Sequence, residues 1–400
     1  MFGARISPST LEVIRRQSLG AQAFDVEMFK QFTVEEISAW TASRYIAYNY
    51  QTTQFLSRWC AFSNEIQWPL AIGVQDTDFQ EVAEGGVTLP SSQRLAEYLS
   101  GAFMTRRQKT FSMTKQAAAY LSLGEFNNEL ESHFRGDRRL IMRQIVRAIF
   151  SPTTKTGRDI EGDSRPLTQY AFANGDSRTY PVAWNGNAVS SPHSHFIGRI
   201  GGSFAGADID AGANHIFEHF PGAMVGHYVG WNSGSTVTAL SGFVPVTYEH
   251  TIPAETITQT DLPKHTQKDE TSLDPVALGV WNGRIVYKAW WIPDGYLVTI
   301  LENIEAVSPD ARNKALRFRV PESPYSQQKV SSRLPMMRGV DGSMQPGLGS
   351  LQVIQTGDQA SIFDATMSER MFGIAPWNPL GVVVTYMGGT SYVEPTIAFA

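Results

Sequence analysis

The chain has 400 residues, of which 42% are hydrophobic and 18% charged, so it can build two or three cores and is not disordered as a whole. Its formal net charge of -5 excludes a general polyanion-binding protein, although local basic patches remain possible. The single cysteine, Cys60, excludes an intramolecular disulfide and a multi-cysteine zinc site, and it is typical of a reducing compartment.

Neither a secretory signal nor a membrane span is expected. The first residues, MFGARISPSTLEVIRRQ, contain no apolar stretch of the kind that a signal peptide needs. No apolar run in the sequence approaches the roughly 18–20 residues that span a bilayer. We therefore expect a soluble protein, made in the cytosol, that has no membrane partner.

Two short helices are predicted near the start of the chain, at residues 9–17 and 33–48. Each begins with a hydroxyl side chain followed three residues later by a glutamate, as in Thr33 and Glu36, and this pair satisfies free amide groups at a helix start. In the second helix, side chains at three- and four-residue spacing form a mostly aromatic face: Ile37, Trp40, Thr41, Arg44, Tyr45 and Tyr48.

A long two-stranded arm is predicted between residues 66 and 111. Side chains alternate in character through IQWPLAIGV, residues 66–74, which is the period of a strand, and Pro69 places this strand at a sheet edge. The strand is followed by an acidic tip of Asp76, Asp78, Glu81 and Glu84 and by a basic return strand, residues 103–111, with Arg106, Arg107 and Lys109. Because an isolated two-stranded ribbon is marginal in water, such an arm needs another surface to lie on.

The strongest helical pattern lies at residues 115–150 and ends before Pro152. Its apolar stripe comprises Leu130, Phe134, Ile141, Ile145 and Ile149, and a row of arginines on another face comprises Arg135, Arg139, Arg143 and Arg147. Such a row is self-repelling unless anions compensate it. Three interpretations stay open: neutralisation within the chain by Glu129, Glu131 and Asp137, contact with acidic residues of a neighbouring subunit, or contact with DNA phosphates.

The second half of the chain is richer in predicted strands. Residues 208–220 have the pattern of a short amphipathic helix, whose inward face would comprise Ile209, Ala213, Ile216, Phe217 and Phe220. The Asn-Gly pair at 282–283 predicts a hairpin within LGVWNGRIVYKAWWI, with the tryptophan pair 290–291 in the middle of a strand. A further hairpin is predicted at the C-terminus, where GVVVTYM and SYVEPTIAF flank a Gly-Gly-Thr turn at 388–390.

The segment HIFEH, residues 215–219, has the His-x-x-Glu-His spacing of the inverted zinc proteases. In that motif two histidines one helical turn apart bind the metal, and the glutamate, here Glu218, activates water. However, Pro221 ends the helix straight after the motif, the apolar residues face the other way, and no acidic third ligand follows in a recognisable helix. We therefore expect His215 and His219 to lie on a solvated helix face.

Two smaller features also have a possible chemical function. The segment HSH contains His193 and His195 but no nearby cysteine or acidic partner, which favours loop or interface histidines over metal ligands. Cys60, in SRWCAF, is expected to be a small buried side chain rather than a nucleophile. We therefore expect no catalytic residue, no cofactor and no bound metal.

The order of these parts is distinctive: an N-terminal arm, a long two-stranded loop, a long helix, a helical lobe with a hairpin, and a C-terminal sheet. The most specific stretches are ELESHFRGDRRLIMRQIVRAIFSPT, YAFANGDSRTYPVAWNGNAVSSPHSHFI, GRIVYKAWWIPDGYLVTI and MFGIAPWNPLGVVVTYMGGTSYVEP. They resemble the end of the spine helix, the segment after it, and the late strands and terminal hairpin of the major capsid proteins of tailed bacteriophages with the HK97 fold. The resemblance covers most of the chain and is looser before residue 110 and across 230–275.

The resemblance implies an α+β, HK97-like capsid fold with an N-terminal arm, an extended β-hairpin loop, a long spine helix with a peripheral-domain sheet, and an axial domain. Its parts would be residues 1–59 (arm and helices), 60–112 (extended loop overlapping an adjacent subunit), 113–199 (peripheral domain with spine helix), 200–300 (axial domain) and 301–400 (return to the peripheral domain and C-terminal strands).

The function that the resemblance implies is structural. The chain would be a major capsid protein that self-assembles, in the host bacterial cytoplasm, into the hexamers and pentamers of an icosahedral virion enclosing double-stranded DNA, which it contacts without sequence specificity. Because the chain starts at Met1 with only a short arm, any scaffold would be a separate protein, and cement and portal proteins are further possible partners.

The charge pattern adds the expectation that the acidic tip of one subunit lies over a basic patch of the next. Two alternatives are also considered. The first is an encapsulin-type shell protein, which is similar in fold but packages a cargo enzyme. The second is a zinc hydrolase that uses His215, Glu218 and His219.

Overall fold

The computed structural model describes residues 34–70, 98–111, 122–159, 166–176, 178, 193–220, 222–246, 275–302, 314–320, 336–338, 344–346, 351–355 and 366–397. The chain divides into two compact units. Unit 1 comprises Met1–Leu56, Met104–Ile141 and Val320–Phe372, and unit 2 comprises Ser57–Phe103, Met142–Arg319 and Gly373–Ala400. These units do not follow the five segments that the resemblance implies, so that division stays a prediction. Among the described residues, no helix combines the length and the apolar character needed to cross a bilayer.

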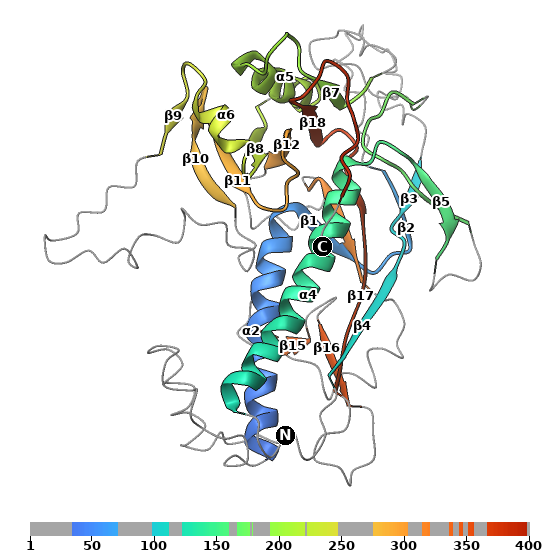
Figure 1. The fold of residues 1–400 in the computed structure, drawn as a ribbon. Coiled ribbons are helices and arrows are strands. Elements are labelled where there is room, and N and C mark those ends of the chain that lie inside the picture. The colour runs from blue at the N-terminus through green and yellow to red at the C-terminus, as the bar shows by residue number, and fades with distance from the viewer. Residues whose placement is uncertain are drawn as a thin grey trace, which may run out of the picture. The chain divides into compact units, whose positions relative to one another are not determined.

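Two long helices, α2 (Val34–Trp59) and α4 (Leu123–Phe150), form the framework of unit 1, and their C-terminal parts belong to unit 2. The helices lie side by side in unit 1 (Figure 1), where the rings of Tyr45 and Tyr48 on α2 lie 5.0 and 4.4 Å from the ring of Phe134 on α4. The three aromatic residues of the predicted face, Trp40, Tyr45 and Tyr48, are therefore buried. The predicted apolar stripe is confirmed too, because all five of its residues are buried: Leu130, Phe134, Ile141, Ile145 and Ile149.

Helix α4 begins at a capping box that the periodic pattern did not locate. The backbone N–H of Glu125 donates to the Ser122 hydroxyl at 3.1 Å, and the Glu125 carboxylate accepts from the backbone N–H of Ser122 at 2.8 Å. This reciprocal pair starts the helix at Leu123, later than the predicted residue 115. The helix ends at Phe150, before Pro152, as predicted.

The strands of unit 1 assemble on the first part of β17 (Thr366–Pro376). On its two sides it pairs antiparallel with β4 (Thr105–Phe111) and β16 (Gln352–Gln355). A separate antiparallel pair consists of β14 (Met336–Arg338) and β15 (Met344–Pro346).

The prediction of one long two-stranded arm was wrong in its pairing. The basic segment pairs with β17 from Phe111 opposite Thr366 to Thr105 opposite Phe372, and the described part of the predicted first strand, residues 66–70, does not pair with it; residues 71–74 lie outside the described residues. Where the arm was expected, the described residues show a short pair of β2 (Gln67–Pro69) and β3 (Leu99–Gly101) in unit 2. The long run along β17 satisfies more backbone groups than a strand interrupted by Pro69, which has no N–H to donate.

A seven-stranded sheet forms the centre of unit 2, in the order β7-β18-β12-β8-β11-β10-β9. Its strands are β7 (Phe196–Gly198), β8 (Met224–Gly230), β9 (Val244–Pro245), β10 (Val276–Trp281), β11 (Arg284–Ala289), β12 (Tyr296–Glu302) and β18 (Val382–Tyr386). Helix α5 (Gly206–Phe217) packs on this sheet through Ile209, Ala213 and Ile216, and the shorter α6 (Gly234–Thr238) adds Val237 to the cluster that contains Ile209. The inward face predicted for residues 208–220 is thus confirmed for these three residues of α5.

Shorter strands complete unit 2. Strand β1 (Cys60–Ser63) pairs parallel with β13 (Leu316–Arg319), which pairs antiparallel with the last part of β17, and β5 (Lys155–Arg158) pairs antiparallel with β6 (Pro166–Gln169). Trp68 on β2 is fully buried and packs with Ala375 and Trp377. Cys60 is buried as predicted, and burial raises the pKa of its thiol to about 12, which removes it as a nucleophile at neutral pH.

The predicted hairpin at 282–283 is confirmed. Asn282 and Gly283 have φ values of 45° and 77° and join β10 to β11, which is the backbone that an Asn-Gly turn favours. The adjacent tryptophans, however, are not in the middle of a strand. Strand β11 ends at Ala289, and Trp290 and Trp291 lie in the connection to β12, which turns through Gly295 at a φ of 82°.

The predicted C-terminal hairpin is wrong. Residues 391–397 form no strand after β18. Both edges of β18 are already paired, antiparallel with β12 and parallel with β7, so no edge is left to receive another strand.

Candidate functional site

The predicted contact between subunits has an acidic and a basic half. The acidic half, Asp76, Asp78, Glu81 and Glu84, lies outside the described residues. The basic half lies on β4, where Arg106, Arg107 and Lys109 are exposed. Within the described part of the chain, β4 pairs with β17 alone and so forms a sheet edge in unit 1. Charged side chains are typical of such edges because they oppose unwanted strand pairing.

The three basic residues of β4 differ in their contacts. Nε and Nη2 of Arg106 donate to the Glu369 carboxylate at 2.7 and 2.9 Å, and Gln108 donates to the same carboxylate at 2.7 Å. Hydrogen bonding to Glu369 and its charge raise the pKa of the Arg106 guanidinium. Lys109 instead donates to the neutral Ser132 hydroxyl on α4 at 3.0 Å. Among the described contacts of these residues, Arg106 is thus the one that meets a carboxylate.

The arginine row lies along the outer side of α4, where Arg135, Arg139 and Arg147 are exposed and Arg143 is half-buried. The three carboxylates that could neutralise it from within the chain contact other basic side chains: Asp137 contacts Arg370, Glu131 contacts Arg44 and Arg138, and Glu129 lies 3.6 Å from His133. Because these carboxylates contact other basic side chains, an anion from outside the chain is favoured as the partner of Arg135 and Arg147, both of which are exposed.

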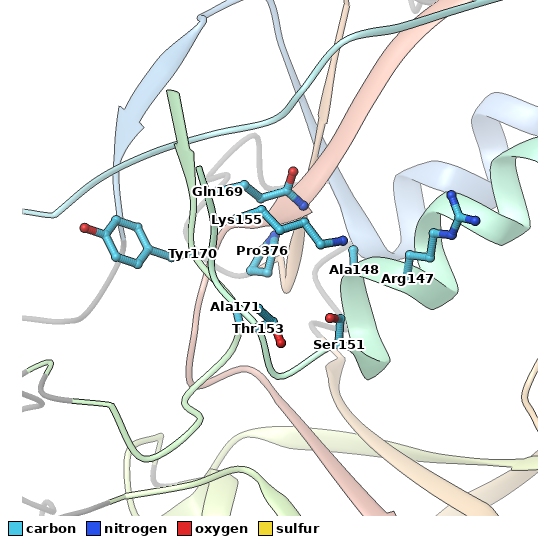
Figure 2. Close-up of a pocket in the computed structure, with 9 residues that line it drawn as sticks. All are labelled: Arg147, Ala148, Ser151, Thr153, Lys155, Gln169, Tyr170, Ala171 and Pro376. Carbon is cyan, nitrogen blue, oxygen red and sulfur yellow. The ribbon is translucent and has the colours of Figure 1, made fainter. Parts of the chain in front are cut away.

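Arg147 also lines a small pocket at the C-terminal end of α4 (Figure 2). Lys155 on β5 and Gln169 on β6 line the same pocket, and Figure 2 shows the ammonium end of Lys155 directed toward the end of α4. The Gln169 side chain donates to the backbone carbonyl oxygen of Ile374 at 3.2 Å, which holds it in place. Two cationic side chains therefore lie at the end of the row.

A buried polar network in unit 1 was not predicted. Arg370 on β17 pairs with Asp137 on α4, with Nε–Oδ1 and Nη2–Oδ2 distances of 2.9 Å each, and the Tyr48 hydroxyl on α2 donates to Asp137 at 2.7 Å. Nη2 of Arg370 also donates to the Asn49 side chain at 3.1 Å. Burial and the charge of Asp137 raise the pKa of Tyr48 well above its ordinary value, so the phenol stays a neutral donor. The network joins two helices and a strand that are far apart in sequence.

The signal for this network is the position of Asp137 on the apolar stripe, three residues after Phe134 and four before Ile141. A charged residue at a core position needs a buried partner. Periodicity identifies such a residue but not its partner, which lies on a strand more than two hundred residues away.

In unit 2, the structure brings the two histidine motifs together. His193 and His195 precede β7, and His219 follows α5. Nε2 of His193 lies 2.9 Å from Nε2 of His195 and 2.9 Å from Nε2 of His219. The ring of His215 lies alongside, with its centroid 5.9 Å from that of His193 and 6.0 Å from that of His195. Each motif taken alone is incomplete as a metal site, whereas the fold brings histidines of both motifs to one place.

Burial and the neighbouring histidines keep these imidazoles neutral. They lower the pKa of His193 to about 4 and that of His219 to about 3, and they lower the pKa of His195 well below its ordinary value. The expectation that His219 lies on a solvated helix face is wrong, because α5 ends at Phe217 and the following turn brings its ring onto His193. Among the described residues, the convergent group is His193, His195 and His219 and does not include Glu218, which caps the C-terminus of α5.

Comparison with known proteins relates the fold to solved structures. No family model matches the chain, and no curated protein matches its sequence. A chain from the structure of Mycobacterium phage Patience matches with a TM-score of 0.55 at 17% identity, covering 90% of this chain and 91% of that chain. A chain of the holo-SrpI encapsulin complex from Synechococcus elongatus PCC 7942 gives 0.43 at 11% identity, covering 96% and 98% of the two chains, and one of the bacteriophage PhiM1 mature capsid gives 0.40 at 11%, covering 84% and 87%. The likeness to the Patience chain extends over both units, and this chain has the α+β, HK97-like capsid fold that its sequence resemblance implied.

Proposed function

We propose that the chain is the major capsid protein of a tailed bacteriophage, which assembles into the hexamers and pentamers of an icosahedral virion around double-stranded DNA. The fold likeness to a phage chain over 90% of this chain carries the proposal. A shell subunit is held by many contacts with its neighbours. Burial of apolar area in these contacts stabilises the shell by roughly 25 cal/mol per Å², so many modest contacts together can hold it closed. The role of the subunit is therefore structural and needs no active site.

Electron microscopy of the purified native material tests this function, together with its absorbance ratio at two wavelengths that distinguish nucleic acid from protein. Icosahedral particles rich in nucleic acid are the expected result. Particles that contain a co-purifying protein cargo instead would favour the encapsulin alternative. A monomer or dimer that forms no particle under any salt condition or with any scaffold protein would contradict the proposal.

The subunit contact that we propose pairs the acidic tip, Asp76 to Glu84, with the basic strand β4 of a neighbouring copy. Because Arg106 already meets Glu369, the attraction falls mainly on Arg107 and Lys109. Replacing both by glutamate should lower the yield of particles several-fold at about 0.1 M salt, where the Debye length is about 10 Å. The deficit should shrink at about 1 M salt, where that length is about 3 Å.

A matched control separates this contact from general charge effects. Arg158 on β5 is also exposed on a strand, and Arg158→Glu should leave the yield unchanged at both salt concentrations. Arg106→Glu should act differently, because it breaks the bond to Glu369 and destabilises the chain itself. Equal yields from the Arg107→Glu, Lys109→Glu variant and the parent would sink the electrostatic contact without touching the capsid function.

Arg135 and Arg147, the exposed ends of the arginine row of α4, form the second surface that we assign to assembly, with acidic residues of a neighbouring subunit as their partner. Arg135→Gln combined with Arg147→Gln should lower particle yield in the same assay. If particles instead form normally but release DNA at lower salt than the parent, the row faces the packaged DNA, because phosphate contacts are strongly salt-dependent.

A further inference from the structure

His193, His195 and His219 direct three ring nitrogens toward one place in unit 2. The two contacts made by Nε2 of His193 measure 2.9 Å each, and the possible ligand atoms of the three residues all lie within 4.8 Å of one another. His193 is 6% exposed and His195 is fully buried, so the meeting point is shielded from solvent.

Hydrogen bonds between neutral imidazoles do not account for this geometry. A neutral ring has one N–H and one lone pair. Nδ1 of His195 lies 2.9 Å from the carbonyl oxygen of Val382, which can only accept, so Nδ1 carries the hydrogen and Nε2 presents its lone pair. If Nε2 of His193 carries a hydrogen, it can donate fully to only one of its two neighbours. If it carries a lone pair, it faces the lone pair of His195.

A metal ion resolves this conflict because it accepts a lone pair from each ring. Imidazole nitrogens bind Zn²⁺ at about 2.0–2.1 Å, which places two ligands of a tetrahedral ion about 3.3 Å apart. The two 2.9 Å contacts need to open by only a few tenths of an ångström to reach that separation, and the nitrogens of His195 and His219, which lie within 4.8 Å of each other, need to move to the same separation. The bond from Nδ1 of His195 to a backbone carbonyl is also the outer contact that orients metal-bound histidines.

We propose that His193, His195 and His219 form a binding site for a divalent transition-metal ion. The ligand set selects the class of ion, because neutral imidazoles suit Zn²⁺, Ni²⁺, Co²⁺ and Cu²⁺, whereas Mg²⁺ and Ca²⁺ prefer oxygen. His215 lies beside the remaining position. Its Nδ1 lies 3.0 Å from the carbonyl oxygen of Ala211, which leaves Nε2 with a lone pair, so the fourth ligand is His215 or water.

The bound ion would link the segment before β7 to the end of α5, two elements that flank β18. Its effect is structural: it ties the edge of the seven-stranded sheet to the helix that packs on it. The inference does not rest on the proposed capsid function, because the site lies within one chain and forms without a neighbouring subunit.

The test uses the full-length protein, stripped of metal with a chelator and titrated with Zn²⁺ in a calorimeter. We expect one Zn²⁺ per chain, a rise in thermal unfolding temperature on binding, and no response to Mg²⁺. His219→Gln should weaken Zn²⁺ binding at least tenfold and abolish the thermal shift. His227→Gln, which alters a buried histidine of β8 outside the cluster, should change neither.

Cobalt gives a readout that does not depend on a variant folding. Co²⁺ added to the stripped parent protein should produce the visible absorption bands of a nitrogen-ligated tetrahedral or five-coordinate ion, and Zn²⁺ should remove them. Absence of both Zn²⁺ binding and Co²⁺ bands at about 100 μM metal would overturn the proposal. Unchanged Zn²⁺ affinity in a folded His219→Gln variant would overturn it as well.

Discussion

Replacing Asp137 by alanine tests the buried network that joins α2, α4 and β17. Asp137 and Arg370 are 7% and 3% exposed, so the substitution leaves a guanidinium buried without its carboxylate. Breaking such a pair costs about 3–5 kcal/mol, and the Tyr48 hydroxyl also loses its acceptor. We expect the free energy of unfolding to fall by at least about 3 kcal/mol, which lowers the urea midpoint by roughly 1 M or more.

Urea unfolding of the full-length protein, followed by tryptophan fluorescence, measures this loss. Asp137→Leu combined with Arg370→Met should recover most of it, because no buried charge then remains unpaired. Glu131→Ala is the matched control: it breaks the ion pair with Arg44 on the same two helices, but both side chains are about one third exposed, so the cost should stay below about 1 kcal/mol. A loss of less than about 1 kcal/mol for Asp137→Ala would refute the reasoning.

Two further predictions concern unit 2 and the helix α4. Burial, followed by the charge of Arg284, lowers the pKa of His227 to about 3, whereas the unfolded chain titrates it near 6.5. The unfolded state therefore binds the proton first as pH falls. Because of this residue, the free energy of unfolding should decrease by about 1.4 kcal/mol when the pH falls from 7.5 to 5.5. His227→Gln should flatten the pH dependence of unfolding by that amount, and an unchanged slope would contradict the assignment. Gly136→Ala should stabilise α4 by up to about 1 kcal/mol, because a Cβ there meets nothing within 4 Å. Gly198→Ala should destabilise by about 1–3 kcal/mol, because its Cβ would lie 2.2 Å from the backbone of Thr390; equal thermal shifts for the two variants would count against this packing.

Local pattern predicted the elements whose signal is short-range. The stripe on α4, the inward face of α5 and the turn at Asn282 and Gly283 depend on residues within one or two helical turns or within a four-residue turn. Each agrees with the structure. The start of α4 was misplaced although Ser122 and Glu125 contain the signal, because a periodic pattern locates a face better than an end.

Partner choice was beyond local pattern. The basic strand 105–111 has the alternation and charge of an edge strand, but whether it pairs with residues 66–74 or with β17 depends on which edge the folded core leaves open. The same holds for the C-terminal residues after β18, whose two neighbours occupy both of its edges. Strand pairing is a competition among segments far apart in sequence, and composition does not decide it.

The candidate metal site shows most clearly the difference between what local pattern predicts and what tertiary structure decides. From sequence alone, the chain determined its helical faces, its turn residues, its single buried thiol and an order of parts that resembles a capsid subunit. Only the tertiary structure decided that HSH and HIFEH share one place, that Asp137 meets Arg370, and that Arg106 is already bound to Glu369. The physical reason is that spacing along a chain fixes neighbours within a turn or a strand, whereas burial of the core brings distant side chains to within bonding distance and sets which of their charges and lone pairs stay unmatched.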